Sequence, residues 1–135
     1  MNYWIQNLVP YGFPEEIRVI QLAWHGDSVS ELHQRLKYVH YPLKSKELHL
    51  SVVNEVKATS QSESLGQIEH LLSENEMNLI KRARNKIKRY PKSTDPSIYS
   101  RATGFETLIG CLFLKDPQRL STLFEYLENL NALNL

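Results

Sequence analysis

Hydrophobic positions in this chain recur at spacings of three and four residues, and the two-residue alternation typical of strands never persists. The pattern therefore predicts an all-α protein. Five helical stretches are expected: about Glu15 to Val39, a short pair within Ser45 to Leu72, Ser73 to about Lys88, about Tyr99 to Leu114, and about Pro117 to Leu130.

Turn and capping residues mark the ends of these stretches. Ser73 followed by Glu76 has the form of a capping box, in which each side chain binds the other residue's backbone N–H. The prolines in residues 1–14 predict an extended arm that packs on a helical body at 15–130. Pro91 and the cluster Ser93–Pro96 predict a loop. We expect one domain over residues 1–135.

The composition is that of a folded domain, but it does not indicate which partner the domain binds. The chain has 135 residues, of which 41% are hydrophobic and 23% charged, so one real core can form. A net charge of +1 does not by itself predict a nucleic-acid ligand. A single cysteine, Cys111, and the lack of a leader-like or long apolar run predict a cytoplasmic protein with no membrane partner.

Two apolar helix faces each carry an acid. At 100° per residue, Asp27 and Glu31 share a stripe with Ile20, Ala23 and Trp24, and Glu106 shares one with Ala102, Ile109, Gly110 and Phe113. A buried carboxylate needs compensation. Each acid could pair with an arginine, such as Arg84 or Arg101, as a purely structural feature. Alternatively, the two acids could face each other across a hard divalent cation such as Mg²⁺.

Glycines accompany both acids. Gly26 precedes Asp27, and Gly110 lies one turn after Glu106. Glycine inside a helix lowers its stability, so these positions indicate a packing reason. A close approach of the two helices around an ion would supply one. The five histidines form no HExxH or Cys/His cluster, which argues against zinc.

Positive charge is concentrated between Lys81 and Lys92, where the sequence reads KRARNKIKRYPK. Such clusters bind phosphates, because each neutralised phosphate releases counterions. A solvated helix end with cations near the negative end of its dipole would look the same. Beside a possible Mg²⁺ site, phosphodiester chemistry explains both features. Lys81, Arg82, Arg84 and Lys86 are the candidates for backbone contacts.

The segment LAWHGDSV at 22–29 resembles the signature helix of ribonuclease III, and GFETLIGCLFL at 104–114 is similar to that family's second acidic helix. The middle of the chain resembles the Mini-III branch, whose members have the catalytic domain without a double-stranded-RNA-binding domain. The segments that carry this second likeness are Leu48-His49, 82–85, 91–95 and 99–104.

The resemblance implies the ribonuclease III endonuclease-domain fold, with Asp27 and Glu106 as catalytic, metal-binding acids. Glu31 matches an acid just after the signature and is a further candidate ligand. Ala23 and Thr103 stand where full-length ribonuclease III has two more acids, so a leaner site is expected. The implied cofactor is Mg²⁺, which Mn²⁺ could replace.

The resemblance also implies a partner and a substrate. It predicts a homodimer formed through the signature helix that cleaves double-stranded RNA and trims precursor 23S ribosomal RNA, with a ribosomal protein as a possible partner on the substrate. His49, Asn85 and Lys92 join the RNA-binding candidates through the matching segments. Leu50, Asn54 and Thr59 stand where the branch usually has basic residues, and Ala83 replaces a glycine.

Two other functions stay open on the sequence. A catalytically weak or inactive RNA-binding or ribosome-associated module could keep the fold, and the missing basic residues favour it. A helical protein-interaction domain could hold both acids for structural reasons. Incubation with a long RNA duplex and Mg²⁺, repeated with Asp27→Asn, separates the three.

Overall fold

The computed structural model describes residues 17–42 and 44–133, so the predicted arm at 1–14 lies outside the described part. Over those residues the chain forms helices and no strand, which confirms the all-α prediction. The elements are α1 (Val19–Tyr38), α2 (Ser45–Val56), α3 (Ala58–Ile68), a 3₁₀ turn η2 (Glu69–Leu71), α4 (Glu74–Asn85), α5 (Pro96–Lys115) and α6 (Pro117–Leu133).

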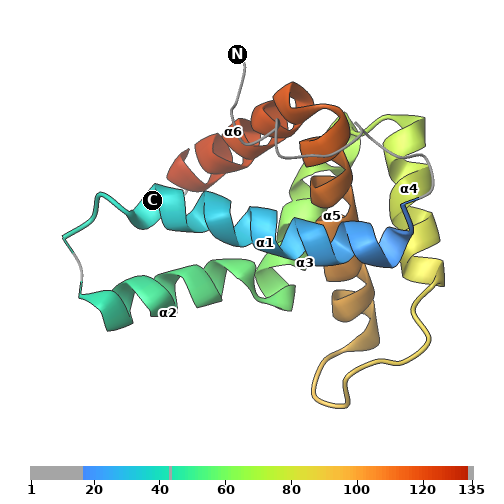
Figure 1. Cartoon of the computed structure of the whole chain (residues 1–135), viewed down its shortest axis with the longest axis horizontal. Helices are drawn as coiled ribbons and strands as arrows, with labels where there is room; N and C mark the ends of the chain where they lie inside the picture. The colour runs from blue at the N-terminus through green and yellow to red at the C-terminus, as the bar shows by residue number, and fades with distance from the viewer. Residues whose placement is uncertain (1–16, 43, 134–135) are drawn as a thin grey trace.

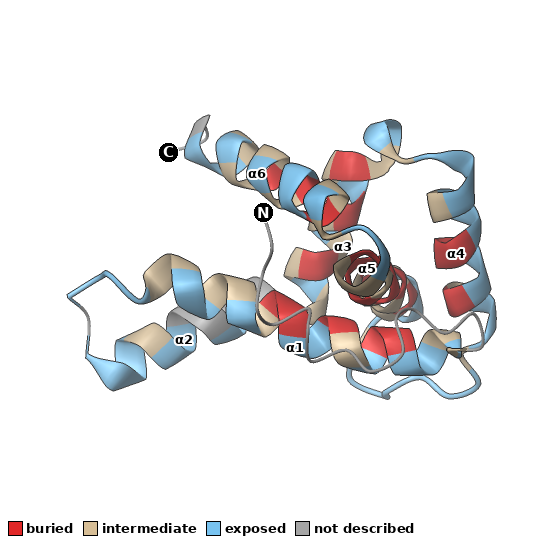
Figure 2. Cartoon of the chain, turned by 45° about the horizontal axis from the view of Figure 1, so that its top comes forward, coloured by how far each residue is buried: buried red, intermediate tan, exposed pale blue. Residues whose placement is uncertain are grey.

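Helix α5 runs through the middle of the structure, and α1, α3, α4 and α6 pack around it (Figure 1). The core gathers along α5, where Leu108 and Ile109 are fully buried against Leu65, Ile68 and Leu123. The C-terminal part of α1 and helix α2 lie side by side and project from this body (Figure 2). Among the described helices, none has the length and apolar character needed to span a bilayer.

Two helices begin at places other than those predicted. Helix α1 was predicted to begin at about Glu15, but it begins at Val19, and Ile17 and Arg18 before it are not helical. The Gln21 side chain caps its first turn by accepting the Arg18 N–H at 3.0 Å. Helix α5 begins at Pro96 instead of near Tyr99, because the Asp95 carboxylate accepts the backbone N–H groups of the first turn at 2.8 and 3.2 Å. Proline fits that turn, so part of the expected loop is helix.

The predicted capping box at the start of α4 is confirmed. Ser73 N donates to Glu76 Oε1 at 2.8 Å, and Glu76 N donates to Ser73 Oγ at 3.1 Å. Arg119 on α6 donates to both Glu76 oxygens and to the Leu71 carbonyl, which joins this cap to the last helix. Helix α4 ends at Asn85, a turn before the predicted Lys88.

The buried face of α1 differs from the predicted one. Leu22, Ala23, Gly26, Val29 and Ser30 are buried, whereas Ile20 is 69% exposed and Trp24 is 79% exposed. The expectation that the Ile20–Trp24–Asp27 stripe forms core is therefore wrong for this chain. On α5 the prediction is confirmed, since Ala102, Ile109 and Gly110 are buried and Glu106 and Phe113 are half-buried.

The reason lies in the two glycines. A Cβ at Gly26 would overlap the backbone carbonyl of Glu106, and a Cβ at Gly110 would overlap the carbonyl of Leu22. Helices α1 and α5 thus touch backbone to backbone at this crossing, as the glycines predicted. Because only the glycine face of α1 allows such an approach, that face turns toward α5.

Candidate active site

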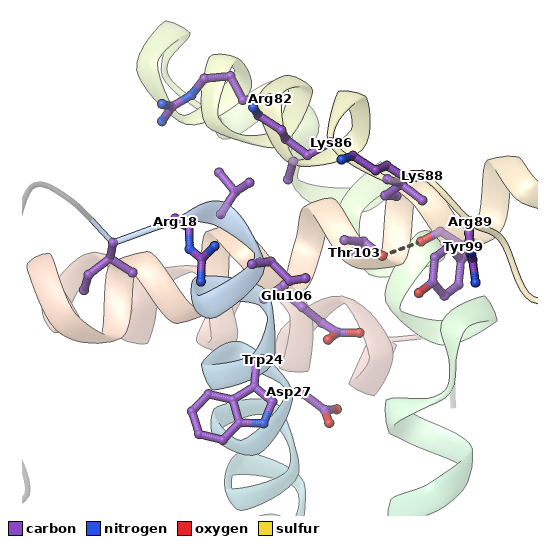
Figure 3. Close-up of a pocket in the computed structure, with 16 residues that line it drawn as sticks. Arg18, Trp24, Asp27, Arg82, Lys86, Lys88, Arg89, Tyr99, Thr103 and Glu106 are labelled. Atoms are coloured by element: carbon purple, nitrogen blue, oxygen red, sulfur yellow. Dashed lines mark hydrogen bonds between the residues drawn. The ribbon is translucent and has the colours of Figure 1, made fainter.

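The crossing of α1 and α5 places Asp27 and Glu106 in one cavity of about 1050 Å³ (Figure 3). Asp27 follows Gly26 on α1, and the backbone of Glu106 contacts Gly26 directly. The same close contact that excludes a side chain at position 26 therefore brings the two acids together. The structure confirms the expectation that they face a common space.

The environment of Glu106 is unfavourable for a charge. Burial and the nearby carboxylate of Asp27 raise the pKa of Glu106 to about 7. The buried amide of Gln61 on α3 lies close enough to offset part of this rise, although Gln61 Nε2 forms no hydrogen bond of ordinary geometry. A cation between the two carboxylates would relieve both causes.

The arginines that could have neutralised the acids are engaged elsewhere. Arg101 pairs with Glu69 at 2.8 Å, and Arg84 Nε donates to Ser100 Oγ at 3.1 Å. Within the described residues, neither Asp27 nor Glu106 forms an ion pair with a basic side chain. This removes the alternative in which each acid has its own arginine.

Glu31 does not join the pair. Its carboxylate accepts from Arg35 one turn later at 2.9 Å, and it does not line the cavity. Over the residues that the structure describes, no three histidine, cysteine or acidic side chains gather to hold a metal. The donor set at the crossing is therefore two carboxylates, and a role for Glu31 stays a prediction.

Neutral residues stand at the two positions, 23 and 103, where full-length ribonuclease III has further acids. Ala23 and Thr103 both line the cavity. The Thr103 hydroxyl donates to the Tyr99 carbonyl at 3.0 Å (Figure 3). Two neutral side chains thus occupy the wall beside the acid pair, as the resemblance implied.

Cations from α4 and the segment after it form the opposite wall. Arg82 and Lys86 were predicted to contact RNA, and both line the cavity. Arg18, Lys88, Arg89 and Tyr99 also line it, although the sequence interpretation did not choose them (Figure 3). Lys88 and Arg89 belong to the basic run that the sequence shows, and Tyr99 begins the segment 99–104 that resembles the Mini-III branch, whereas Arg18 carries no local signal.

The other predicted RNA-binding residues lie away from the cavity. Lys81 and Asn85 are exposed on α4, Lys92 is exposed in the loop before α5, and His49 is exposed on α2. Arg84 is held against α5 by Ser100, so its guanidinium has a structural partner. These five can meet RNA only outside the acid pair's immediate surroundings.

The residues that depart from the Mini-III pattern lie in two different places. Leu50 and Thr59 are exposed on α2 and α3, where basic residues were expected. Ala83, which replaces a glycine, is 2% exposed and lines the cavity. The side chain of Asn54 lies outside the described part. The lost positive charge is thus confined to the α2–α3 side, and the α4 wall keeps its cations.

Comparison with known proteins decides the family. A profile of the Ribonuclease III domain matches residues 20–117, which include both acids and the cationic wall. The chain belongs to the ribonuclease III family. A Mini-ribonuclease 3 of Synechococcus sp. is 41% identical over 106 residues, covering 78% of this chain and 77% of the relative. A Mini-ribonuclease 3 of Synechocystis sp. is 32% identical over 127 residues, covering 93% of this chain and 89% of the relative.

A solved structure has the same fold. A crystal structure of a protein from Fusobacterium nucleatum superposes with a TM-score of 0.78 at 27% identity, covering 90% of this chain and 97% of that one. The predicted resemblance to the Mini-III branch is therefore confirmed, and this ribonuclease III chain is an endoribonuclease.

Proposed function

We propose that this chain is a Mg²⁺-dependent endoribonuclease that cleaves double-stranded RNA, with Mn²⁺ able to replace Mg²⁺. The observation that carries the proposal is the acid pair, Asp27 and Glu106, facing a cavity whose other wall is cationic. The substrate that the Mini-III resemblance predicts is the precursor of 23S ribosomal RNA. A ribosomal protein on that precursor is part of the same prediction.

The donor chemistry fits Mg²⁺. The ion prefers oxygen ligands and is usually held by one or two carboxylates together with waters. Asp27 and Glu106 provide such a set, and burial together with the repulsion from Asp27, which raise the pKa of Glu106 to about 7, favour a cation between them. When bound, Mg²⁺ supplies Lewis acidity to the scissile phosphate and lowers the pKa of water.

The chain's own residues bind and orient the RNA. Arg82, Lys86, Lys88 and Arg89 line the same cavity as the acids, where they can neutralise phosphates near the scissile one. A-form RNA is recognised largely through its shape, its phosphates and its 2′-hydroxyl groups. A wall of cations suits the recognition of phosphates, so we expect little sequence preference.

The outer face of α1 supports the proposed homodimer. Ile20 and Trp24 are large apolar residues, 69% and 79% exposed, that lie beside Asp27. They lie one helical turn apart and together form an exposed apolar patch, and such patches commonly mark a surface that a second copy covers. We expect Trp24→Glu to shift the wild-type dimer toward monomer in sedimentation velocity. Met77→Glu, at an exposed apolar residue of α4, is the matched control and leaves the dimer intact. A monomeric wild type contradicts this part of the proposal.

The activity is tested on a long RNA duplex with Mg²⁺, with Mn²⁺, and with a chelator. Asp27→Asn and Glu106→Gln should each lower the single-turnover rate by roughly 10²–10³-fold or more, since each removes charge stabilisation from the reaction. Glu63→Gln, at an exposed acid of α3, is the control and should cleave like the wild type. Wild-type retention of RNA without cleavage would support the non-catalytic module instead.

The substrate assignment needs its own comparison. Precursor 23S ribosomal RNA, with and without its bound ribosomal proteins, is compared with a duplex of equal length and unrelated sequence. Preferential cleavage at the mature ends supports the ribosomal role. Equal cleavage of both substrates contradicts it and leaves the nuclease activity itself standing.

A further inference from the structure

A second, much smaller cavity lies behind the acid pair. Its volume is about 40 Å³, and residues of α1, α3, α5 and α6 line it. Gln61 lines this cavity and also lies beside Glu106. The residue therefore connects the small cavity to the active site.

Three buried polar atoms around this cavity make no hydrogen bond of ordinary geometry. They are Ser30 Oγ, Gln34 Oε1 and Gln61 Nε2, and all three residues line the cavity, although the Gln61 amide also lies beside Glu106. Ser30 is 7% exposed and Gln61 is 4% exposed. Buried polar groups almost always have a partner, because leaving one unpaired is costly. Three such atoms around one space indicate a shared ligand.

The size and chemistry of the space fit water. A buried water needs about 10–15 Å³ and two to four polar partners, and this cavity provides both. An amide nitrogen donates, an amide oxygen accepts and a hydroxyl does either, which matches the two donors and two acceptors of one water molecule. A nucleotide or a sugar is far too large for this volume.

Contacts between α1 and α6 form one wall of the cavity. His33 Nε2 lies 2.9 Å from Glu128 Oε1, and the His33 ring stacks on Phe124 with 4.0 Å between ring centres. These contacts hold α6 against α1. The cavity is partly open to solvent, since exposed Asn131 and half-exposed Glu128 also line it, whereas the three polar atoms themselves are buried.

We propose that the cavity holds ordered water that fixes the Gln61 side chain beside Glu106, which makes Gln61 a positioning residue for the acid pair. The amide nitrogen has two hydrogens, so Gln61 can donate to the water and still direct a hydrogen toward Glu106. The positioning role rests on the proposed function of Glu106, whereas the water site does not. Support of this kind behind a metal-binding group commonly changes affinity or rate by about 10–100-fold.

The first test is a high-resolution crystal structure of the wild type. We expect an ordered water within hydrogen-bond distance of Ser30 Oγ, Gln34 Oε1 and Gln61 Nε2. Gln61→Leu keeps the approximate shape of the side chain but cannot bind the water, so its structure should show a displaced or differently bonded water. A dry wild-type cavity overturns the water site.

The second test separates positioning from general damage. In single-turnover cleavage of an RNA duplex, Gln61→Leu should lower the rate at saturating enzyme about tenfold and change the half-saturating concentration less than twofold. Calorimetry should show a similar loss of Mg²⁺ affinity. Gln67→Leu, on the same helix but outside the cavity lining, should leave both unchanged. Gln34→Leu, which touches only the water side, should give a smaller loss.

The outcomes distinguish the two proposals. Wild-type cleavage that Gln61→Leu does not slow overturns the positioning role and leaves the proposed function intact. A wild type that neither binds Mg²⁺ nor cleaves duplex RNA overturns the proposed function and the positioning role together. The crystallographic test of the water site is unaffected by that result.

Discussion

Helices α1 and α5 are alike in length and in the residues at their crossing, but α5 is the more deeply buried of the two. Each has 20 residues, one glycine at their mutual crossing and one acid of the pair. Four helices pack against α5, whereas α1 buries mainly the face that it turns to α5. Asp27 is therefore exposed, while burial and Asp27 raise the pKa of Glu106 to about 7. The environment of each acid is set by neighbouring helices and not by its own.

The difference in burial between Glu106 and Asp27 suits the two acids to different roles. Glu106 is held on a rigid central helix with Gln61 behind it, which suits a group that must keep its position. Asp27 lies on the open side, next to the exposed Trp24, where RNA or a second copy can reach it. The contrast between a held acid and an accessible acid can be tested by substitutions on each helix.

The largest effect is expected at the crossing itself. Gly110→Val and Gly26→Val should destabilise the fold by about 4 kcal/mol or more, because each side chain would overlap backbone of the other helix. Circular dichroism during urea unfolding measures the loss. Gly66→Ala is the control, since Gly66 is exposed on α3 and alanine favours a helix by up to about 1 kcal/mol. Ordinary stability of either valine variant would mean that the helices do not touch here.

The next effect compares a buried leucine of α5 with an exposed one of α1. Leu108→Ala, at a residue with 0% exposure, should cost about 2–5 kcal/mol. Leu36→Ala, at a residue that is 60% exposed, should change the free energy of unfolding by less than about 0.5 kcal/mol. Denaturant midpoints with equal slopes measure both. A large loss at Leu36 would show that another surface covers this part of α1.

Glu106 should make stability depend on pH. Its folded-state pKa of about 7 exceeds the ordinary 4.5, so the folded protein binds the extra proton between these values. The free energy of unfolding of the metal-free protein should therefore fall as the pH rises from about 4.5 to 7, by roughly 1–3 kcal/mol. Unfolding in buffers of matched ionic strength measures this. In Glu106→Gln the decline should be absent, and a wild type with constant stability across the window would contradict the raised pKa.

The smallest effect tests the coupling between the two helices. Asp27→Asn removes one cause of the raised pKa of Glu106, so that pKa should fall but stay above 4.5, because burial is the larger cause. Carbon-13 NMR of labelled glutamate follows the titration. Glu31→Gln should leave the pKa unchanged, since Glu31 pairs with Arg35. An unchanged pKa in Asp27→Asn would show that the acids do not sense each other.

The sequence by itself determined the features that depend on near neighbours in the chain. Helical periodicity predicted the all-α fold, and Ser73 with Glu76 predicted the start of α4, because the capping interactions span three residues. The glycines beside the acids predicted a close helix crossing, since each carried a cost that only packing explains. The start of α5 was missed although Asp95 and Pro96 are a recognisable cap and first turn.

The tertiary structure alone decided which faces and side chains meet. Periodicity predicted an inner stripe of α1 that includes Trp24, whereas the backbone contact at Gly26 turns another face inward and leaves Trp24 exposed. Glu31 turns to Arg35, while Gln61 comes to the acid pair from α3, a segment distant in the chain from both acids. Such meetings depend on how helices cross, and a helix's own sequence specifies its faces without specifying its neighbours.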